Sequence, residues 1–211
     1  SGIDKAVVFR YVQGEQTLDA NKFIRAAVDK YSERLIGFAW IDPRDKGAKT
    51  EIRNAVLKWG FRGIKLHMGL TPAPSDNIRE IFSEAEELSI PVCVHLGEDL
   101  DFMNTMCNEY NVSVIIAHLG TGVYLLDPHR LKRAVTLAAE YDKVYLETSG
   151  NTYFFVDYAV RKLGPSRIIF GSDFPHEHPL IQVRTVELLD ISARDKSLIL
   201  GGNISRLIKL V

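Results

Sequence analysis

Short apolar runs alternate along the chain with segments whose apolar residues recur at helical spacing. Most runs are continuous and have no polar face, which is typical of strands covered on both sides in a parallel sheet. Between them, apolar residues repeat at i, i+3, i+4 and i+7, as on one face of an amphipathic helix. The pattern predicts seven β-strands, at residues 5–9, 35–41, 64–67, 91–96, 113–118, 144–148 and 167–172.

The predicted helices fill the intervals between these strands and extend past the last one. We expect them near residues 20–31, 48–59, 78–88, 99–110, 128–141, 153–163, 180–189 and 193–210. Ser75 or Asp76 is expected to cap the third helix. Because no linker, repeat or low-complexity segment interrupts the series, residues 1–211 are predicted to form a single domain.

An alternating strand and helix order leaves two architectures. A doubly wound open sheet holds seven strands, but it usually carries a glycine-rich phosphate loop after its first strand, and no Gly-x-Gly-x-x-Gly or Walker pattern occurs here. An α/β barrel of the TIM type has eight strands and about 250 residues. The TIM-type (β/α) barrel is favoured, with seven strands recognised.

Composition and charge remove several classes of partner. Hydrophobic residues make up 46% of the 211 residues, and the formal net charge is -1. No basic excess points to nucleic acid or to an anionic membrane surface. No apolar run reaches the roughly 20 residues that span a bilayer, and no signal peptide is recognised. The two cysteines, Cys93 and Cys107, make no disulfide framework, so a reducing cytoplasm is expected.

Three of the predicted strands end in a residue that could carry chemistry. His95, His118 and Asp173 stand at the ends of the fourth, fifth and last apolar runs in comparable positions. If the strands are parallel and closed into a barrel, these side chains converge at one mouth. Imidazole nitrogen and carboxylate oxygen suit a borderline divalent ion such as zinc. Taken singly, each histidine could be a satisfied polar residue, and Asp173 could cap a turn.

Other polar residues lie near the same strand ends. Lys65 and His67 share one face of a strand and could line the barrel interior. A buried ammonium is costly without a partner, so Lys65 should face a carboxylate, of which Glu147 is a possible one, or the mouth of the site. His67 could point into the site or cap a loop. Lys65 and His67 are candidate substrate-binding residues.

The segment after the last strand contains a His-x-His pair, His176 and His178. Prolines flank this pair in a loop, so we expect a substrate-contacting or solvent-exposed role rather than metal binding, and His176 is the candidate substrate-binding residue. Cys93 lies two residues before His95 on the same face. It is interpreted as core packing, because no base is recognisable beside it.

Six motifs together resemble the amidohydrolase superfamily, and within it the amidohydrolase-2 type whose branch includes aminocarboxymuconate semialdehyde decarboxylase. They are GIKLH at 63–67, PVCVHLG at 91–97, VIIAHLG at 114–120, VYLETSG at 144–150, RIIFGSDFP at 167–175 and LGGNISRL at 200–207. The resemblance implies a (β/α) barrel with one divalent metal, commonly zinc. It further implies that His95 and Asp173 bind the metal, that Asp173 accepts a proton from metal-bound water, and that His118 acts as acid or base.

The chain departs from the family at its start. Members begin with a strand ending in His-x-His that supplies two further ligands, whereas residues 1–9 here resemble the family's second strand. Either the chain is a fragment, the favoured interpretation because it begins with Ser1, or it is a natural short form. The metal site is expected to be incomplete, and zinc binding by this chain is expected to be weak.

The function expected first is hydrolysis of an amide, ester or lactone in a small molecule by metal-activated water. The first alternative is a metal-dependent decarboxylase of a small unsaturated or aromatic acid, which carboxylate-binding arginines near the mouth would favour. The second is a non-catalytic barrel that binds a ligand or a partner. Substrate choice lies in loops 68–77, 98–104, 121–128 and 174–180, and a homodimer is one assembly that the sequence allows.

Overall fold

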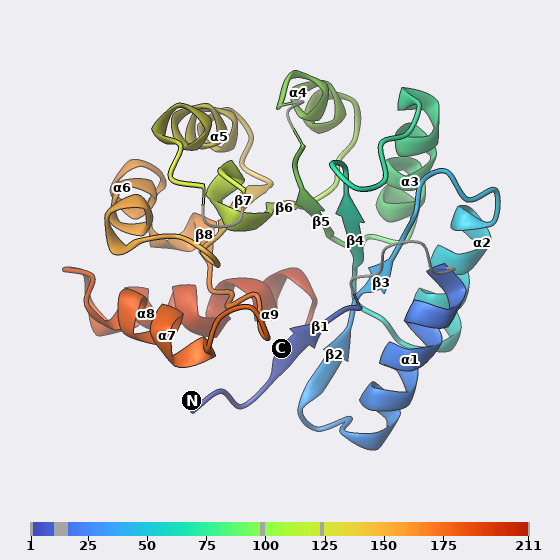
Figure 1. Ribbon diagram of the computed structural model, residues 1–211, viewed down its shortest axis with the longest axis horizontal. Helices are drawn as coiled ribbons and strands as arrows, with labels where there is room; N and C mark the ends of the chain where they lie inside the picture. The colour runs from blue at the N-terminus through green and yellow to red at the C-terminus, as the bar shows by residue number, and fades with distance from the viewer. Residues whose placement is uncertain (1, 11–16, 98–99, 123–124, 211) are drawn as a thin grey trace.

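Parallel strands form the centre of the computed structural model, which describes residues 2–10, 17–97, 100–122 and 125–210 (Figure 1). The first two strands pair with each other, and the other six follow one another in chain order. All recorded pairings are parallel. The strands are β1 (Ala6–Val8), β2 (Leu35–Gly37), β3 (Ala39–Trp40), β4 (Ile64–His67), β5 (Val92–His95), β6 (Val114–Ile116), β7 (Val144–Glu147) and β8 (Ile168–Ile169).

The predicted strand at 35–41 is present but divided at Phe38. Its first half pairs with β1 and its second half with β4. The Phe38 amide still donates to the Val8 carbonyl at 2.9 Å, so the two small ladders form one continuous arc. A Cβ on Gly63 would overlap the Phe38 ring. The absence of a side chain at Gly63 therefore provides the space in which this ring is buried. The seven predicted strands are therefore confirmed in order.

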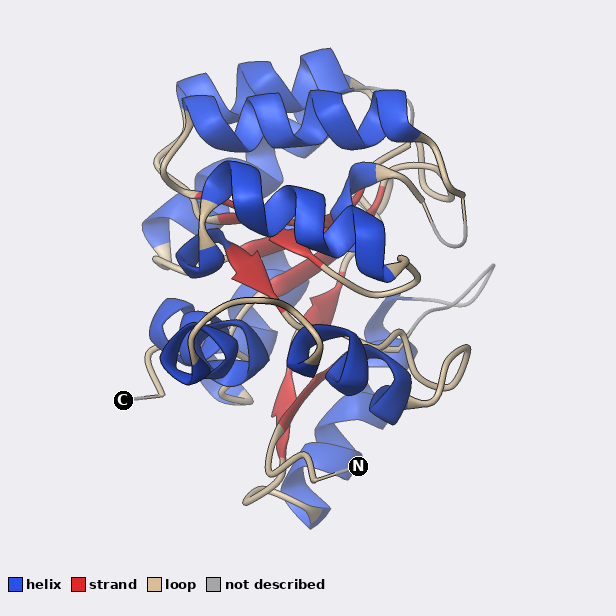
Figure 2. Cartoon of the chain, turned by 90° about the vertical axis from the view of Figure 1, so that its left-hand side faces the viewer, coloured by secondary structure: helices blue, strands red, loops and turns tan. Residues whose placement is uncertain are grey.

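Helices cover the outer side of this arc, as Figures 1 and 2 show. Most begin and end within a few residues of the predicted positions, and residue 99 of the predicted fourth helix lies outside the described residues. Neither Ser75 nor Asp76 caps α3, because the helix already begins at Ser75 and Pro74 holds the cap position. The helices are α1 (Thr17–Lys30), α2 (Ala48–Arg53), α3 (Ser75–Glu87), α4 (Leu100–Glu109), α5 (Pro128–Glu140), α6 (Tyr153–Leu163), α7 (Pro179–Glu187), α8 (Ala193–Ser197) and α9 (Asn203–Leu207).

Two of the predicted helices contain a wider π-helical turn. The turn Asn54–Lys58 continues α2, and the turn Leu198–Gly202 joins α8 to α9. The helix predicted at 193–210 is therefore one helical stretch with an irregular middle. No helix in the described parts of the chain is long and apolar enough to cross a membrane.

Two apolar clusters lie on opposite sides of the strands. The larger one joins the outer strand faces to the helices, and it contains most of the buried aliphatic residues. The smaller one contains Cys93, Ile115, Tyr145 and Ile169, which alternate along β5 to β8 with residues of the larger cluster and therefore face the interior. The architecture is a TIM-type (β/α) barrel.

The C-terminal residues also enter the interior cluster. Ile204, Leu207 and Ile208 pack on it together with Val7 and Phe9, which lie on or directly after β1. Asn203 secures the start of α9 by donating to the carbonyls of Pro165 and Ile168 at 2.8 and 2.7 Å. Among the described residues no pairing joins β8 to β1. Helix α9 thus contributes apolar contacts to the two strands at the ends of the arc.

Candidate active site

Three histidines meet where β4, β5 and β6 end. His67 and His95 are register partners on adjacent strands, and their rings stack with centroids 3.9 Å apart and an interplanar angle of 11°. The His118 ring meets the His95 ring edge-on at 4.9 Å and 65°. The convergence of strand ends predicted for His95 and His118 is confirmed, and His67 joins them. The other role expected for His67, as the cap of a loop, is also present, because its Nδ1 accepts from the Leu70 amide.

His118 lies two residues past the end of β6, whereas the prediction placed it on the strand. Strand β6 ends at Ile116, and residues 117–120 form a tight turn in which His118 and Leu119 have φ of 56° and 51°. Left-handed backbone is costly for residues with a side chain. The turn is held from β7, because the His118 amide donates to Glu147 Oε2 at 3.1 Å instead of continuing a strand ladder.

Glu147, at the end of β7, accepts three hydrogen bonds. Besides the His118 amide, the Ser149 hydroxyl donates to Oε2 at 2.8 Å and the Ser149 amide donates to Oε1 at 2.7 Å. The Ser149 hydroxyl oxygen also lies 2.9 Å from His118 Nδ1. A Cβ on Gly171 would overlap Glu147 Oε1, so the glycine after β8 leaves the space that the carboxylate fills. The ends of β6, β7 and β8 are therefore joined through one side chain.

Lys65 is buried in the interior, as expected, but the predicted ion pair with Glu147 is not formed. Its side chain is 4% exposed. Its Nζ lies 3.7 Å from Cys93 Sγ and 5.0 Å from the centre of the Phe9 ring. The Glu147 oxygens are instead occupied by backbone and hydroxyl donors. Burial raises the pKa of the Cys93 thiol, which agrees with its interpretation as core packing.

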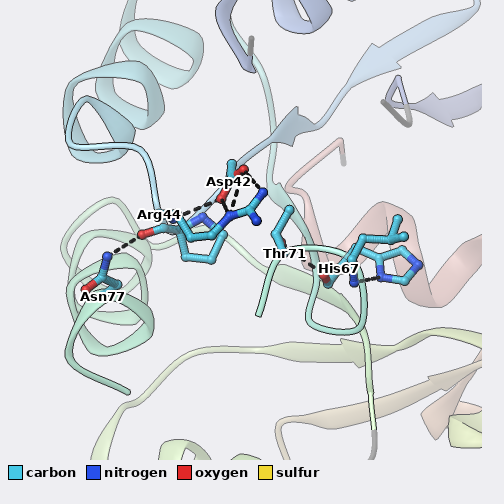
Figure 3. A network of polar contacts seen from close by, with 7 residues as sticks. Asp42, Arg44, His67, Thr71 and Asn77 are labelled. Atoms are coloured by element: carbon cyan, nitrogen blue, oxygen red, sulfur yellow. Dashed lines mark hydrogen bonds and ion pairs between the residues drawn. The ribbon is translucent and has the colours of Figure 1, made fainter. Parts of the chain in front are cut away.

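The loop after β4 holds His67 in place (Figure 3). The Leu70 amide donates to His67 Nδ1 at 3.2 Å, and Thr71 Oγ1 donates to the His67 carbonyl at 3.0 Å. Because Nδ1 accepts, the neutral ring carries its hydrogen on Nε2. Asn77 Nδ2 donates to the Pro43 carbonyl at 2.6 Å and so ties the loop after β3 to helix α3. His67 offers the mouth a hydrogen-bond donor.

The electrostatics of the mouth favour neutral imidazoles. Burial, followed by the charge of Lys65, lowers the pKa of His67 to about 4. Burial, the other two histidines, Lys65 and Arg130 lower the pKa of His95 to about 2. Removing a charged group from water disfavours its charged form, which accounts for the direction in both cases. The charges of Lys65 and Arg130 both act on His95, whereas His67 is influenced by Lys65 and by the opposite charge of Asp173.

Asp173 lies in the loop after β8, partly buried, with φ of 53°. It is close enough to act electrostatically on both His67 and Cys93. Its carbonyl accepts from the His176 amide at 2.9 Å, which closes a turn. His176 is exposed, and His178 Nδ1 accepts from the Leu180 amide at 3.2 Å as the cap of α7. Both histidines of the His-x-His pair are therefore exposed, and His178 in addition caps a helix.

A catalytic metal ion needs about three protein ligands that converge on one point. Within the described ranges, no group of three or more His, Cys, Asp or Glu side chains is placed to hold an ion. The stacked rings of His67 and His95 lie side by side, and His67 Nδ1 is already used by a backbone amide. These residues do not make a complete metal centre.

Two residues of this site were not found from the sequence. Ser149 stands in the strand-end motif of β7, two positions after Glu147, and only its contacts mark it. Arg130, on α5, donates to the carbonyls of Gly97 and Gly120, after β5 and β6. An arginine two positions into a predicted amphipathic helix gives no signal of that role. Of the loops expected to set specificity, residues 98–99 and 123–124 lie outside the described residues.

Comparison with known families assigns the chain to one of them. The sequence profile of the family described as amidohydrolase matches residues 3–210. The chain belongs to the amidohydrolase family. A search of curated protein sequences finds no match.

Solved structures similar to this amidohydrolase share its fold at low identity. An uncharacterised TIM-barrel protein from Bordetella bronchiseptica has a TM-score of 0.78 and 19% identity, covering 99% of this chain and 78% of its own. 5-Carboxyvanillate decarboxylase from Novosphingobium aromaticivorans was solved with manganese and 4-hydroxy-3-methoxy-5-nitrobenzoic acid. It has a TM-score of 0.77 and 18% identity, covering 99% of this chain and 77% of its own. 2,6-Dihydroxybenzoate decarboxylase from Rhizobium has a TM-score of 0.70 and 21% identity, covering 92% of this chain and 77% of its own.

The lowered histidine pKa values predict acid sensitivity of the fold. Unfolded histidine binds a proton near pH 6.5, whereas His67 does so only near 4, so between these values the unfolded state holds more protons. The free energy of unfolding therefore falls as the pH falls through this window, by at most about 1.4 kcal/mol per pH unit for each histidine and by less for the partly exposed His67. Urea unfolding of the wild type and of His67→Gln from pH 7.5 to 4.5 measures this slope.

The His67→Gln variant should show the smaller pH dependence, and the exposed His129→Gln serves as its control. Equal slopes in the wild type and His67→Gln would show that His67 takes up its proton equally well in the folded chain.

The donor set also predicts weak metal binding by this chain. His95 and Asp173, the ligands that the family resemblance implies, would make two, where a catalytic site has about three and an open position. We expect zinc or manganese to be lost on dialysis, measured as metal content per chain, and His95→Ala to change that content little. One tightly held ion per chain that disappears in His95→Ala would contradict the prediction.

Proposed function

We propose that this amidohydrolase-family chain is part of a metal-dependent decarboxylase that removes carbon dioxide from a small aromatic or unsaturated acid. The observation that carries the proposal is the mouth at which His67, His95 and His118 gather, where the cations Lys65 and Arg130 act electrostatically on His95 and the Asp173 carboxylate acts on His67. The two cations can attract a substrate that keeps a carboxylate until the chemical step.

The similar structures support this class of reaction. The decarboxylases from Novosphingobium and Rhizobium act on aromatic acids according to their names. The family profile itself is described as amidohydrolase, so hydrolysis of an amide, ester or lactone remains the second candidate. The proposal changes the order of the two activities expected from the sequence.

The proposed roles follow from what each side chain can donate or accept. Loss of carbon dioxide leaves an electron pair on the carbon that carried the carboxylate, and that carbon then takes up one proton. Asp173 and His118 are the groups that we assign to hold and move this proton. His67 Nε2, which carries the ring hydrogen, and the charge of Lys65 would orient an oxygen atom of the substrate. His176 remains a proposed substrate contact at the rim.

The proposed cofactor is a divalent metal. One similar decarboxylase contains manganese, and no observation favours zinc over manganese here. His95 and Asp173 are our proposed ligands from this chain. Because the described residues do not complete a metal centre, we assign no step of the reaction to the ion.

An assay of carbon dioxide release tests the proposal. The chain is incubated with 2,6-dihydroxybenzoate or 5-carboxyvanillate in the presence of excess manganese, and with a panel of aryl amides and lactones. We expect carbon dioxide from an aromatic acid, and a fall of at least about 100-fold in the Asp173→Asn variant because a proton carrier is removed. The exposed Asp190→Asn is the matched control and should retain the activity.

Two results would contradict the decarboxylase assignment. Hydrolysis of an amide or lactone without carbon dioxide release from any acid would favour the second candidate. Absence of turnover in both panels would favour a non-catalytic barrel that binds a ligand or a partner.

A further inference from the structure

The contacts of His118 determine which nitrogen of its ring carries the hydrogen in the neutral form. Nδ1 lies 3.2 Å from the carbonyl oxygen of Ser149 and 2.9 Å from its hydroxyl oxygen. A carbonyl oxygen can only accept, so the first contact requires a hydrogen on Nδ1. The second contact alone does not determine the tautomer, because a hydroxyl can either donate or accept.

The Glu147 carboxylate decides the direction of the second contact. The Ser149 hydroxyl has one hydrogen, and Glu147 Oε2 lies 2.8 Å away as its acceptor. Once this hydrogen is donated to Glu147, the hydroxyl oxygen can only accept from Nδ1. Both contacts therefore select the same tautomer, with the hydrogen on Nδ1 and the lone pair on Nε2. Free histidine favours the opposite tautomer, so the selection must come from the protein.

The network is well placed to enforce this selection. His118 is 4% exposed and Ser149 is 2% exposed, so water competes little for their hydrogen bonds. Glu147 also holds the His118 amide, so that the backbone and the ring are fixed by the same carboxylate. Gly171 provides the space for that carboxylate.

We infer that Ser149, anchored by Glu147, is a positioning residue that holds His118 in the Nδ1–H tautomer and so leaves Nε2 able to accept a proton. The inference deepens the proposed function, on which it rests for the role of His118. Orientation and tautomer of an imidazole are set in the same way by the second hydrogen bond of the ring at other histidine sites. Neither Glu147 nor Ser149 itself needs to touch the substrate.

The tautomer is measured on the chain itself by two-bond proton–nitrogen correlation spectra of the histidine rings. Spectra are taken at about pH 8.5, well above the ordinary histidine pKa of about 6.5. The signal of His118 is identified by its loss in His118→Gln. In the wild type we expect the Nδ1–H form in roughly five- to tenfold excess, which corresponds to one hydrogen bond of ordinary strength.

Ser149→Ala removes the hydroxyl, and the Nδ1–H excess should fall to near parity or below. Ser149→Thr restores a hydroxyl and should restore the excess, whereas a merely structural role would not depend on that group. Ser83→Ala, at an exposed position of α3, is the matched control and should keep the wild-type ratio.

An Nε2–H form dominant in the wild type would overturn the inference, as would an unchanged ratio in a folded Ser149→Ala. The wild-type spectrum is decisive even if a variant fails to fold. Because the tautomer is measured without turnover, a dominant Nδ1–H form in a chain that releases no carbon dioxide counts against the proposed function alone.

Discussion

The Glu147 carboxylate is the interaction on which the rest of the site depends. It accepts from the His118 amide, the Ser149 amide and the Ser149 hydroxyl, and it fills the space beside Gly171. A half-buried carboxylate with several donors is strongly held in one orientation. The loops that follow β6, β7 and β8 therefore cannot move independently. This side chain makes three strand ends a single structural unit.

The histidine cluster follows from that unit and from strand register. Parallel pairing places His67 directly beside His95, and the bent turn at residues 117–120 brings the His118 ring against them. Burial among these rings, together with Lys65 and Arg130, keeps His67 and His95 neutral at ordinary pH through their lowered pKa values. The result is a set of uncharged imidazoles with the cations Lys65 and Arg130 and the carboxylate Asp173 near them. This setting is compatible with an anionic substrate, and the aromatic-acid decarboxylases among the similar structures make decarboxylation the better supported of the two candidate reactions.

Periodicity along the sequence was sufficient for the barrel, because strands buried on both sides and amphipathic helices differ plainly in pattern. It also placed His95 at the end of β5, whereas His118 and Asp173 lie in the segments that follow β6 and β8. It could not give the turn at His118, which is imposed by Glu147, 29 positions away in the chain. Because the Glu147 oxygens accept from the donors of His118 and Ser149, the expected pairing of Glu147 with Lys65 does not form. The C-terminal segment shows a similar limit, since an apolar helical pattern does not say which of two cores Ile204 and Ile208 will join.

A double-mutant cycle between Gly171 and Glu147 tests the central claim most directly, with the free energy of unfolding as the measured quantity. In the wild-type background, Gly171→Ala should cost about 1–3 kcal/mol, because the new methyl group overlaps the carboxylate. In Glu147→Ala it should cost less than about 0.5 kcal/mol, as at Gly201, where a Cβ has open space. An equal cost of Gly171→Ala in both backgrounds would contradict the account, because the two strand ends would then be independent.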